Sequence, residues 1–249
     1  MRSIVMVSAS IVALVSAPAA ARDGAWYVGG DFGAMIVEDT QIEYTLPGVD
    51  AVTLDHATGY DGALFVGYDL GAFRLEGEVA YKKASVDEFE NTIAIPSSSG
   101  PHPIGQREGF GSQSALSFMI NGMLDFGDDD GLSGFVGGGA GVARVDFSNI
   151  RAFENTGEFL DDSDTRFAWQ IVAGVRTAVS RSVDVTLRYR FFNVGDSNMI
   201  AFGNEDVKAG MGSHSLLAGL TFNFGAPPPP SGEWRGRLGG RLDSEGAAA

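Results

Sequence analysis

The chain has 249 residues, a formal net charge of −15 and no cysteine. The negative charge argues against nucleic-acid binding, and the absence of cysteine excludes disulfides as a source of stability. The 35 glycines are too many for a helical protein and follow no three-residue period, which excludes collagen. Beyond the N-terminus, no apolar run is long enough to form a transmembrane helix.

Residues 1–21 are predicted to be a secretory signal peptide. Arg2 supplies the positive start, and Ala19–Ala21 offers a small-residue cleavage site. The apolar run Ile4–Val15 between them is about half of the ~20 residues that a spanning helix needs. A membrane anchor is the alternative, but the short run favours export.

Eight stretches of alternating apolar and polar residues follow, and each is predicted to be a β-strand. They are Trp26–Val37, Tyr60–Leu70, Phe73–Lys82, Leu116–Asp125, Gly134–Phe147, Phe167–Arg176, Val183–Phe191 and Ser215–Phe224. Each has roughly ten residues, which matches the apolar thickness of the outer membrane at a tilt near 45°.

The segments that join these strands alternate between short and long. The short ones are Asp69–Ala72, Gly127–Ser133 and Ser180–Ser182. The long ones run near Glu38–Ala57, Ser85–Ser112, Ser148–Thr165 and Asn193–Gly212. This asymmetry is typical of bacterial outer-membrane barrels, which have tight periplasmic turns and long surface loops. The sequence therefore predicts an all-β fold, an eight-stranded antiparallel up-and-down transmembrane barrel over residues 22–225, located in the cell outer membrane with four long extracellular loops.

In most of the predicted strands, one face is apolar and the other is polar. The clearest case is the third, where Phe73, Leu75 and Val79 alternate with Arg74 and Glu76. Because lipid surrounds a membrane barrel, the apolar face should point outward and the polar face inward. The glycine-rich strand Gly134–Phe147 allows either arrangement, and we favour Arg144 and Asp146 inward with Phe135 outward.

The inward charges are expected to meet inside the barrel. The lumen of an eight-stranded barrel is just wide enough for side chains to fill, and charges buried there without partners would be costly. We therefore predict a barrel-interior ion network that plugs the lumen and consists of Arg74, Glu76, Glu78, Lys82, Asp125, Arg176, Asp184, Arg188 and Arg190. A narrow porin for small solutes is the alternative.

Four stretches resemble the eight-stranded N-terminal barrel of OmpA-like outer-membrane proteins. They are Ala25–Gly29, Gly59–Asp69, Phe73–Tyr81 and Tyr189–Phe192, and the likeness covers about Ala25–Phe224. Related small porin-like surface antigens share the pattern. In the last strand, Gly219, Phe222 and Phe224 look like the terminal signal that the barrel-assembly machinery reads, so the resemblance implies this machinery as a partner.

After Phe224 the sequence departs from the family pattern. Members often continue through a proline-rich hinge into a domain that binds peptidoglycan, and Ala226–Pro230 looks like that hinge. Only Ser231–Ala249 follows, with no apolar period that could build a core. Residues 226–249 are therefore predicted to be a Pro-rich hinge and a disordered tail, and peptidoglycan binding is not expected.

Few residues are candidates for chemistry. His56, His102 and His214 are predicted to be solvated, because none lies near a nucleophile motif and His214 and Ser215, as neighbours in a strand, point to opposite faces. The acidic residues of the long segments could hold Ca²⁺ or Mg²⁺ that bridges to lipopolysaccharide phosphates, but a solvated charged surface is the favoured interpretation. They are Asp161, Asp162 and Asp164 with Glu154 and Glu158, and Glu38, Asp39, Glu43, Asp50 and Asp55.

No catalytic residue, cofactor or metal is therefore predicted. Gly24-Ala25-Trp26 matches the short start of the lipocalins, which are soluble eight-stranded barrels, but this match is weak. Lipocalins turn an apolar face inward around a ligand, whereas the inward face predicted here carries charges. The expected function is structural: envelope integrity and surface interaction through the loops, with outer-membrane lipid and lipopolysaccharide as partners. A lipid-A-modifying enzyme is the second alternative.

Overall fold

The computed structural model describes residues 24–44, 49–97, 99–127, 131–152, 157–180 and 182–224. The predicted signal peptide and the predicted Pro-rich hinge and tail lie outside these residues. The strands are β1 (Trp26–Val37), β2 (Thr40–Tyr44), β3 (Val49–His56), β4 (Gly59–Asp69), β5 (Phe73–Asn91), β6 (Gly105–Glu108), β7 (Phe110–Gly127), β8 (Leu132–Arg151), β9 (Leu160–Ala178), β10 (Val183–Ala201) and β11 (Glu205–Phe224). In the described part of the chain, no helix has the length and hydropathy to cross a bilayer.

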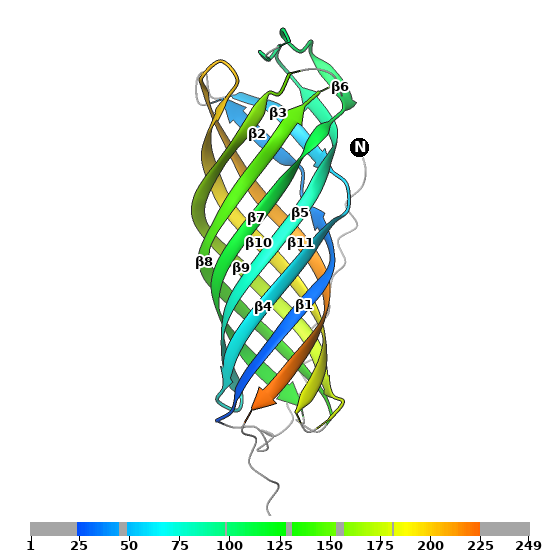
Figure 1. Ribbon diagram of the computed structural model, residues 1–249, viewed down its shortest axis with the longest axis vertical. Coiled ribbons are helices and arrows are strands. Elements are labelled where there is room, and N and C mark those ends of the chain that lie inside the picture. The colour runs from blue at the N-terminus through cyan, green and yellow to red at the C-terminus, as the bar shows by residue number, and fades with distance from the viewer. Residues whose placement is uncertain are drawn as a thin grey trace, which may run out of the picture.

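Eight of the strands close into one antiparallel barrel (Figure 1). Around the ring, β1 is followed by β4, β5, β7, β8, β9, β10 and β11, and β11 pairs again with β1. A walk from Trp26 through paired residues passes Tyr68, Leu75, Gly122, Gly138, Ile171, Phe191 and His214 before it reaches Ile36. One circuit thus climbs ten residues along β1, which fixes a steep strand tilt. The predicted fold is confirmed.

The prediction of four long loops is wrong, because most of those residues are strand. β5, β9 and β10 each have 19 residues, and β8 and β11 each have 20. The segment predicted as the first loop forms the β2–β3 hairpin. Paired strands satisfy backbone hydrogen bonds in water as well as in lipid, so the barrel can continue beyond the membrane.

The sequence did not predict these strand extensions, because their apolar residues face the lumen and their polar residues face outward. In the upper part of β8, Val145 and Phe147 point into the barrel, whereas Arg144 and Ser148 lie on the outer face. A search for apolar residues on the outer face therefore stops where the membrane stops.

The β2–β3 hairpin takes the place of β1 and β4 at the extracellular end. Ile42 of β2 pairs with Ala209 of β11, and Leu54 of β3 pairs with Phe89 of β5. Below the hairpin, β1 and β4 occupy the same two places in the ring. The barrel is therefore eight-stranded at both levels, and the short β6 adds to the outer end of β5.

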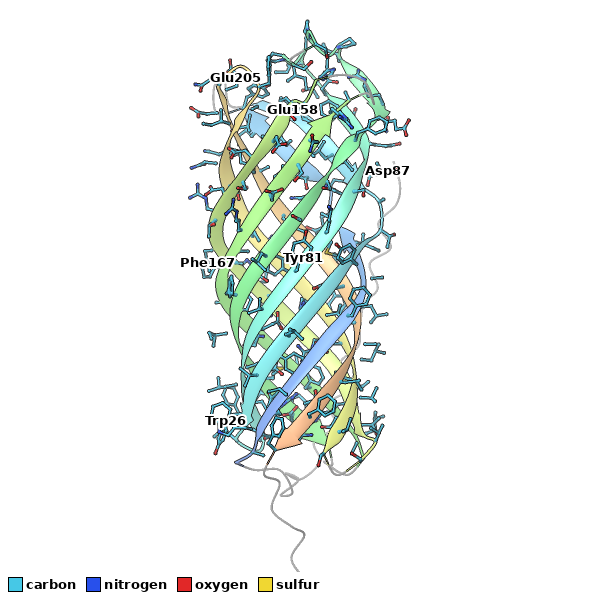
Figure 2. All side chains as sticks on the ribbon, in the orientation of Figure 1. Trp26, Tyr81, Asp87, Glu158, Phe167 and Glu205 are labelled. Carbon is cyan, nitrogen blue, oxygen red and sulfur yellow. The ribbon has the colours of Figure 1, made fainter. Side chains whose placement is uncertain are left out.

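Large apolar side chains cover the outer wall of the lower barrel. The most exposed of them include Phe32, Leu64, Ile120 and Phe167, each more than 60% accessible. Figure 2 shows Trp26 near the periplasmic end, Phe167 partway up the wall and Glu205 at the opposite end. The apolar band thus ends well below the extracellular tips, as expected for a membrane belt about 25 Å tall.

The favoured orientation of Gly134–Phe147 is also wrong. Phe135 is buried in the lumen, and its ring lies 5.2 Å from the guanidinium carbon of Arg74 and 5.5 Å from that of Arg188. Arg144 is exposed and donates a hydrogen bond to Ser163 Oγ. A phenylalanine can face a charged lumen because its ring attracts the cations that surround it.

Candidate functional site

Charged side chains fill the lumen within the apolar band. We call this cluster the ionic layer; its basic members are Arg74, Lys82, Arg176, Arg188 and Arg190, and its acidic members are Asp31, Asp61, Asp69, Glu76, Glu78 and Asp125. All come from positions of β1, β4, β5, β7, β9 and β10 that alternate with lipid-facing ones. The strand period of two places them on one side of the wall.

Arg190 is at the centre of the upper part of the ionic layer. Its Nη1 donates to both carboxylate oxygens of Asp61 at 2.9 Å, and its Nη2 donates to Glu78 Oε2 at 2.9 Å. Lys82 Nζ lies 3.6 Å from Asp61 Oδ1 and 4.2 Å from the ring centroid of Phe192. Arg190 and Lys82 are both fully buried, so each depends on these partners.

Arg188 extends the layer towards the periplasm. Its Nη1 lies 3.1 Å from Asp31 Oδ2 and 3.6 Å from Glu78 Oε2, and its Nη2 lies 3.4 Å from Glu76 Oε1. One guanidinium therefore joins carboxylates from β1 and β5 across the lumen.

The lowest part of the layer is built around Asp125. It accepts hydrogen bonds from Arg74 Nε at 2.6 Å and Nη2 at 2.9 Å. Arg176 Nη2 lies 3.8 Å from Asp125 Oδ2 and 3.9 Å from Asp69 Oδ2. Asp184 lies on β10 near the periplasmic turn and accepts a hydrogen bond from Asn223 Nδ2 at 3.0 Å.

The predicted network lacked three acidic residues that the structure places in the ionic layer: Asp31, Asp61 and Asp69. A signal for them existed, because all three alternate with apolar residues in the first two predicted strands. Alternation in the sequence predicts on which face of its strand a residue lies, but not which residue of another strand it pairs with. Only the barrel register brings Asp61 of β4 to Arg190 of β10.

Neutral polar groups and glycines complete the packing of the lumen. Asn121 and Gln170 donate to the two carboxylate oxygens of Glu78, each at 3.2 Å. A Cβ at residue 219 would overlap the carboxylate of Asp31, so a larger residue there would displace Asp31. This local constraint supplies a structural role for Gly219, which the sequence suggested as part of an assembly signal.

A second cluster, entirely apolar, lies above the ionic layer. We call it the apolar cap; its largest fully buried members are Met35, Ile42, Leu54, Phe89, Ile95, Phe147, Ile150, Phe159 and Phe192. Ile42 and Leu54 come from the hairpin, Met35 from the upper end of β1, and Phe89, Phe147, Ile150 and Phe192 from the upper halves of long strands. Ile95 and Phe159 lie outside the strands. Phe192 belongs to the cap and also contacts Lys82, so the two layers are in direct contact.

Comparison with known proteins agrees with this architecture. The family model of the outer membrane protein beta-barrel domain matches residues 7–224. The chain belongs to this family. It is accordingly an integral protein of the cell outer membrane, as the sequence predicted.

Individual relatives are distant. Outer membrane protein PagN of Salmonella typhimurium is 28% identical over 118 residues, which are 43% of this chain and 49% of PagN. The match thus spans about half the length of PagN. The crystal structure of OprG from Pseudomonas aeruginosa has 12% identity and a TM-score of 0.53, and covers 81% of this chain and 97% of OprG. Neisserial surface protein A has 20% identity and a TM-score of 0.46, and covers 81% of this chain and 100% of that protein. At these identities the solved structures show the fold alone.

The prediction of three solvated histidines is wrong for two of them. His56 and His102 are buried at the extracellular end of this family member, with 8% and 2% of their surfaces accessible. His214 is partly exposed on the outer wall, whereas the neighbouring Ser215 is buried in the lumen. The prediction that His214 and Ser215 point to opposite faces is therefore confirmed.

The acidic run in the third long segment has a structural role in the seam between β9 and β10. The two strands separate above Ala168 and Val194, and carboxylates fill the gap. Asp162 accepts from the backbone N–H of Ile200, and Asp164 accepts from that of Asn198, each at 2.9 Å. Among the described residues, no group of three or more His, Cys, Asp or Glu is arranged to hold a metal ion.

Proposed function

We propose that this outer-membrane barrel is a non-conducting structural protein that contributes to envelope integrity and presents a surface at its extracellular end. The proposal rests on the two clusters that fill the lumen one above the other, the ionic layer and the apolar cap. An ion on its way through would first meet the ionic layer and then the apolar cap.

The two layers would oppose permeation for different reasons. In the ionic layer, a passing ion would have to separate pairs such as Arg190 with Asp61, whose partners would remain as uncompensated buried charges. In the apolar cap, the ion would lose its hydration among buried apolar side chains, since the polar Thr40 and Gln113 beside them are hydrogen-bonded to each other. Because the barriers are in series, weakening one would leave the other.

Single-channel recording tests the proposal. The refolded protein is added to a planar lipid bilayer, with a known porin recorded under the same salt as the positive control. We expect no conductance steps from this protein. Reproducible steps from the wild type would support the narrow porin instead.

The surface role rests on the extensions above the membrane. Their outer faces are polar, and the tips expose isolated apolar side chains such as Ile104 and Phe202. A rigid scaffold that presents variable tips suits recognition. Protease treatment of intact cells should cleave the tips and leave the membrane-embedded strands protected; complete protection would count against surface display.

Lipid, lipopolysaccharide and the barrel-assembly machinery are the partners we propose. Phe222 and Phe224 are exposed on the lipid-facing side of the last strand, where an assembly factor could contact them before insertion. We assign no enzymatic activity, because Ser215 and His214 lie on opposite sides of the wall.

A further inference from the structure

The ionic layer has one more acidic than basic side chain. Its lower part is balanced, with two carboxylates and two guanidinium groups around Asp125. Its upper part has four carboxylates and three basic groups: Asp31, Asp61, Glu76 and Glu78 with Lys82, Arg188 and Arg190. Within the ionic layer, one negative charge therefore has no counter-charge.

Three of the four upper carboxylates accept hydrogen bonds that favour their ionised form. Arg190 donates to both oxygens of Asp61 and to Glu78 Oε2, each at 2.9 Å. Glu76 Oε1 accepts a hydrogen bond from Tyr27 Oη at 3.1 Å. A donor aimed at a carboxylate stabilises its charge, so these three groups are the better anions.

Asp31 is the exception. Only 5% of its surface is accessible, yet neither of its oxygens accepts a hydrogen bond from a described residue. Its cross-strand neighbours, Ala63 of β4 and Gly219 of β11, offer no polar side chain. Arg188 Nη1 lies 3.1 Å from Asp31 Oδ2 without hydrogen-bond alignment, and the same guanidinium is shared with two glutamates.

The charged groups that face Asp31 come from three strands. They are Arg188 and Arg190 of β10, Glu76 and Glu78 of β5, and Asp61 of β4, whose cross-strand partner Gly33 lies two residues after Asp31. The two arginines are thus shared among four carboxylates. The uncompensated charge falls on Asp31, because it has the fewest donors.

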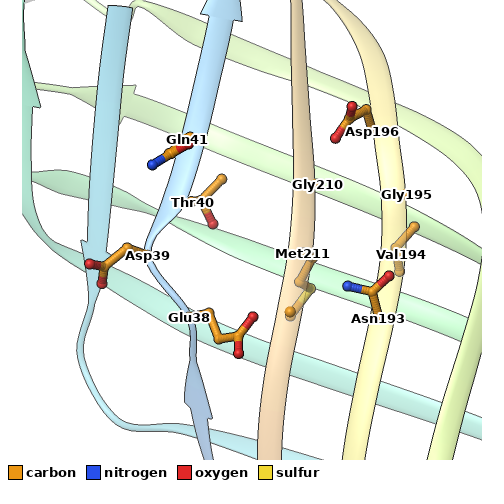
Figure 3. A pocket seen from close by; sticks show the side chains of 11 residues that line it. Glu38, Asp39, Thr40, Gln41, Asn193, Val194, Gly195, Asp196, Gly210 and Met211 are labelled. Atoms are coloured by element: carbon orange, nitrogen blue, oxygen red, sulfur yellow. The ribbon is translucent and has the colours of Figure 1, made fainter. Parts of the chain in front are cut away.

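An uncompensated charge at Asp31 would be costly. The next residue, Phe32, is 64% accessible on the outer wall, so Asp31 lies in the lumen at the level of the membrane belt. Carboxylates in contact with water have no such cost: Glu38 and Asp39 are exposed and line an open groove of the wall (Figure 3). A buried carboxylate without a full partner is neutralised by taking up a proton.

We propose that Asp31 holds a proton at neutral pH, so that the ionic layer contains one neutral carboxylic acid. The five remaining carboxylates then balance the five basic groups. Oδ2 stays an acceptor towards Arg188 Nη1, and Oδ1 carries the proton. A metal ion is the poorer choice, since the described part of the chain has no group of three or more His, Cys, Asp or Glu arranged to hold one.

Infrared spectroscopy of the refolded full chain in micelles tests the proposal. A protonated carboxyl has a carbonyl stretch at higher frequency than the amide and carboxylate bands, and this stretch shifts when the proton is exchanged for deuterium. We expect such a band in the wild type at neutral pH and its loss in Asp31→Asn. The difference spectrum of the two proteins assigns the band to Asp31.

Stability separates Asp31 from its ionised neighbours. Asp31→Asn replaces the acid by a neutral group of the same shape, so its urea midpoint should equal or exceed that of the wild type. Asp61→Asn is the matched control: it removes a charge that Arg190 and Lys82 share, so the midpoint should fall while the carbonyl band remains. Heat-modifiable gel mobility shows whether each variant has folded, and Asp31→Ala serves for the spectrum if Asp31→Asn has not.

The pH dependence of unfolding gives a second measurement. The carboxyl of Asp31 is ionised in the unfolded chain at neutral pH, so folding would take up one proton. From about pH 6 to about pH 8, the unfolding equilibrium constant of the wild type should therefore rise about tenfold per pH unit relative to that of Asp31→Asn. Stability thus falls as the pH rises, because the folded chain binds one proton more than the unfolded chain.

Three results would overturn the proposal. The absence of a protonated carboxyl band from the folded wild type would show that all six carboxylates are ionised. A band that persists in the folded Asp31 variants would place the proton on another residue. Wild-type stability that depends on the sodium concentration, with the same pH dependence as Asp31→Asn, would make the additional positive charge a metal ion.

Discussion

The two halves of this barrel have opposite interiors. The ionic layer is polar within a wall whose outside is apolar, and the apolar cap is apolar within a wall whose outside is polar. The strands β5, β7, β8, β9, β10 and β11 run through both halves, and the β2–β3 hairpin takes the places of β1 and β4 in the upper one. The comparison shows that what surrounds the wall decides which face of a strand is apolar: lipid requires it outside, whereas water drives it inside.

The change of pattern coincides with irregularities where β1 gives way to β2 and β3 to β4. Glu38 and Asp39 are both exposed, although neighbours in a strand normally alternate. Below them Met35 and Val37 point inward, and above them Thr40 and Ile42 do so. Two consecutive outward residues shift the parity by one, as a β-bulge does.

The largest expected effect is the loss of a charge from the ionic layer. Glu78→Ala should destabilise the barrel by about 3–5 kcal/mol, because it leaves Arg190 and Arg188 short of a buried partner. Glu76→Ala should act in the same direction through Arg188. Urea unfolding in detergent micelles measures both variants.

The matched control for this prediction is Glu88→Ala, which removes an exposed carboxylate from the same strand above the membrane. Its unfolding midpoint should stay close to that of the wild type. Unchanged unfolding of both Glu76→Ala and Glu78→Ala would mean that the inward charges do not depend on one another.

A cavity in the apolar cap should have a more local effect. Phe147→Ala removes a fully buried ring and should cost about 3 kcal/mol. Because the ionic layer lies below, hydrogen exchange should accelerate in β2, β3 and the upper half of β8 while the lower strands stay protected. Equal acceleration throughout the barrel would show that the two layers unfold as one unit.

Acid should weaken the extracellular end of the barrel through His56, whose strand partner Val86 belongs to the apolar cap. Burial, only partly offset by Asp55, lowers the pKa of His56 from 6.5 to about 4. The unfolded chain therefore binds a proton in a range where the folded barrel does not, so stability is full above about pH 6.5 and falls as the pH drops towards 4. The loss should approach about 3 kcal/mol at the acid end.

Urea midpoints of the wild type and of His56→Leu at about pH 7 and pH 4.5 test this linkage. The variant should lose less stability than the wild type between the two. An identical loss would assign the acid sensitivity to other groups, among which His102 is buried and also has a lowered pKa.

Overpacking the junction of β1 and β11 should have a smaller effect on the ionic layer. Gly219→Ala places a methyl group where the Asp31 carboxylate lies and should cost about 2 kcal/mol. Ala218→Gly, at the adjacent lipid-facing position, is the control for changes in strand propensity. If the methyl group displaces Asp31 from Arg188, the double variant Gly219→Ala, Asp31→Ala should show a non-additive loss.

The smallest effect concerns the seam between β9 and β10. Asp164→Leu should leave the backbone N–H of Asn198 without its acceptor and cost about 1 kcal/mol. Partial burial alone would raise the pKa of Asp164, but backbone donors and Arg166 hold it below its usual value. Faster exchange of the Asn198 amide is expected, and Asp161→Leu on the exposed side of β9 is the control.

The polar inner face of the lower barrel could be predicted because lipid makes its alternation unambiguous. Arg74, Glu76 and Glu78 alternate with apolar residues, and all three lie in the lumen as expected. The face of β8 could not be predicted, because glycines carry no preference and Phe135 is held inside by cations from other strands.

The amino-acid sequence by itself determined the strands of the membrane belt, their inward charges and the location of the protein. These features depend on the two-residue period of a strand and on the cost of polar groups in lipid. Only the tertiary structure decided which charges pair, how far the barrel continues beyond the membrane and what fills its upper end. Pairing depends on the register between strands, and the upper end reverses its pattern because water replaces lipid outside the wall.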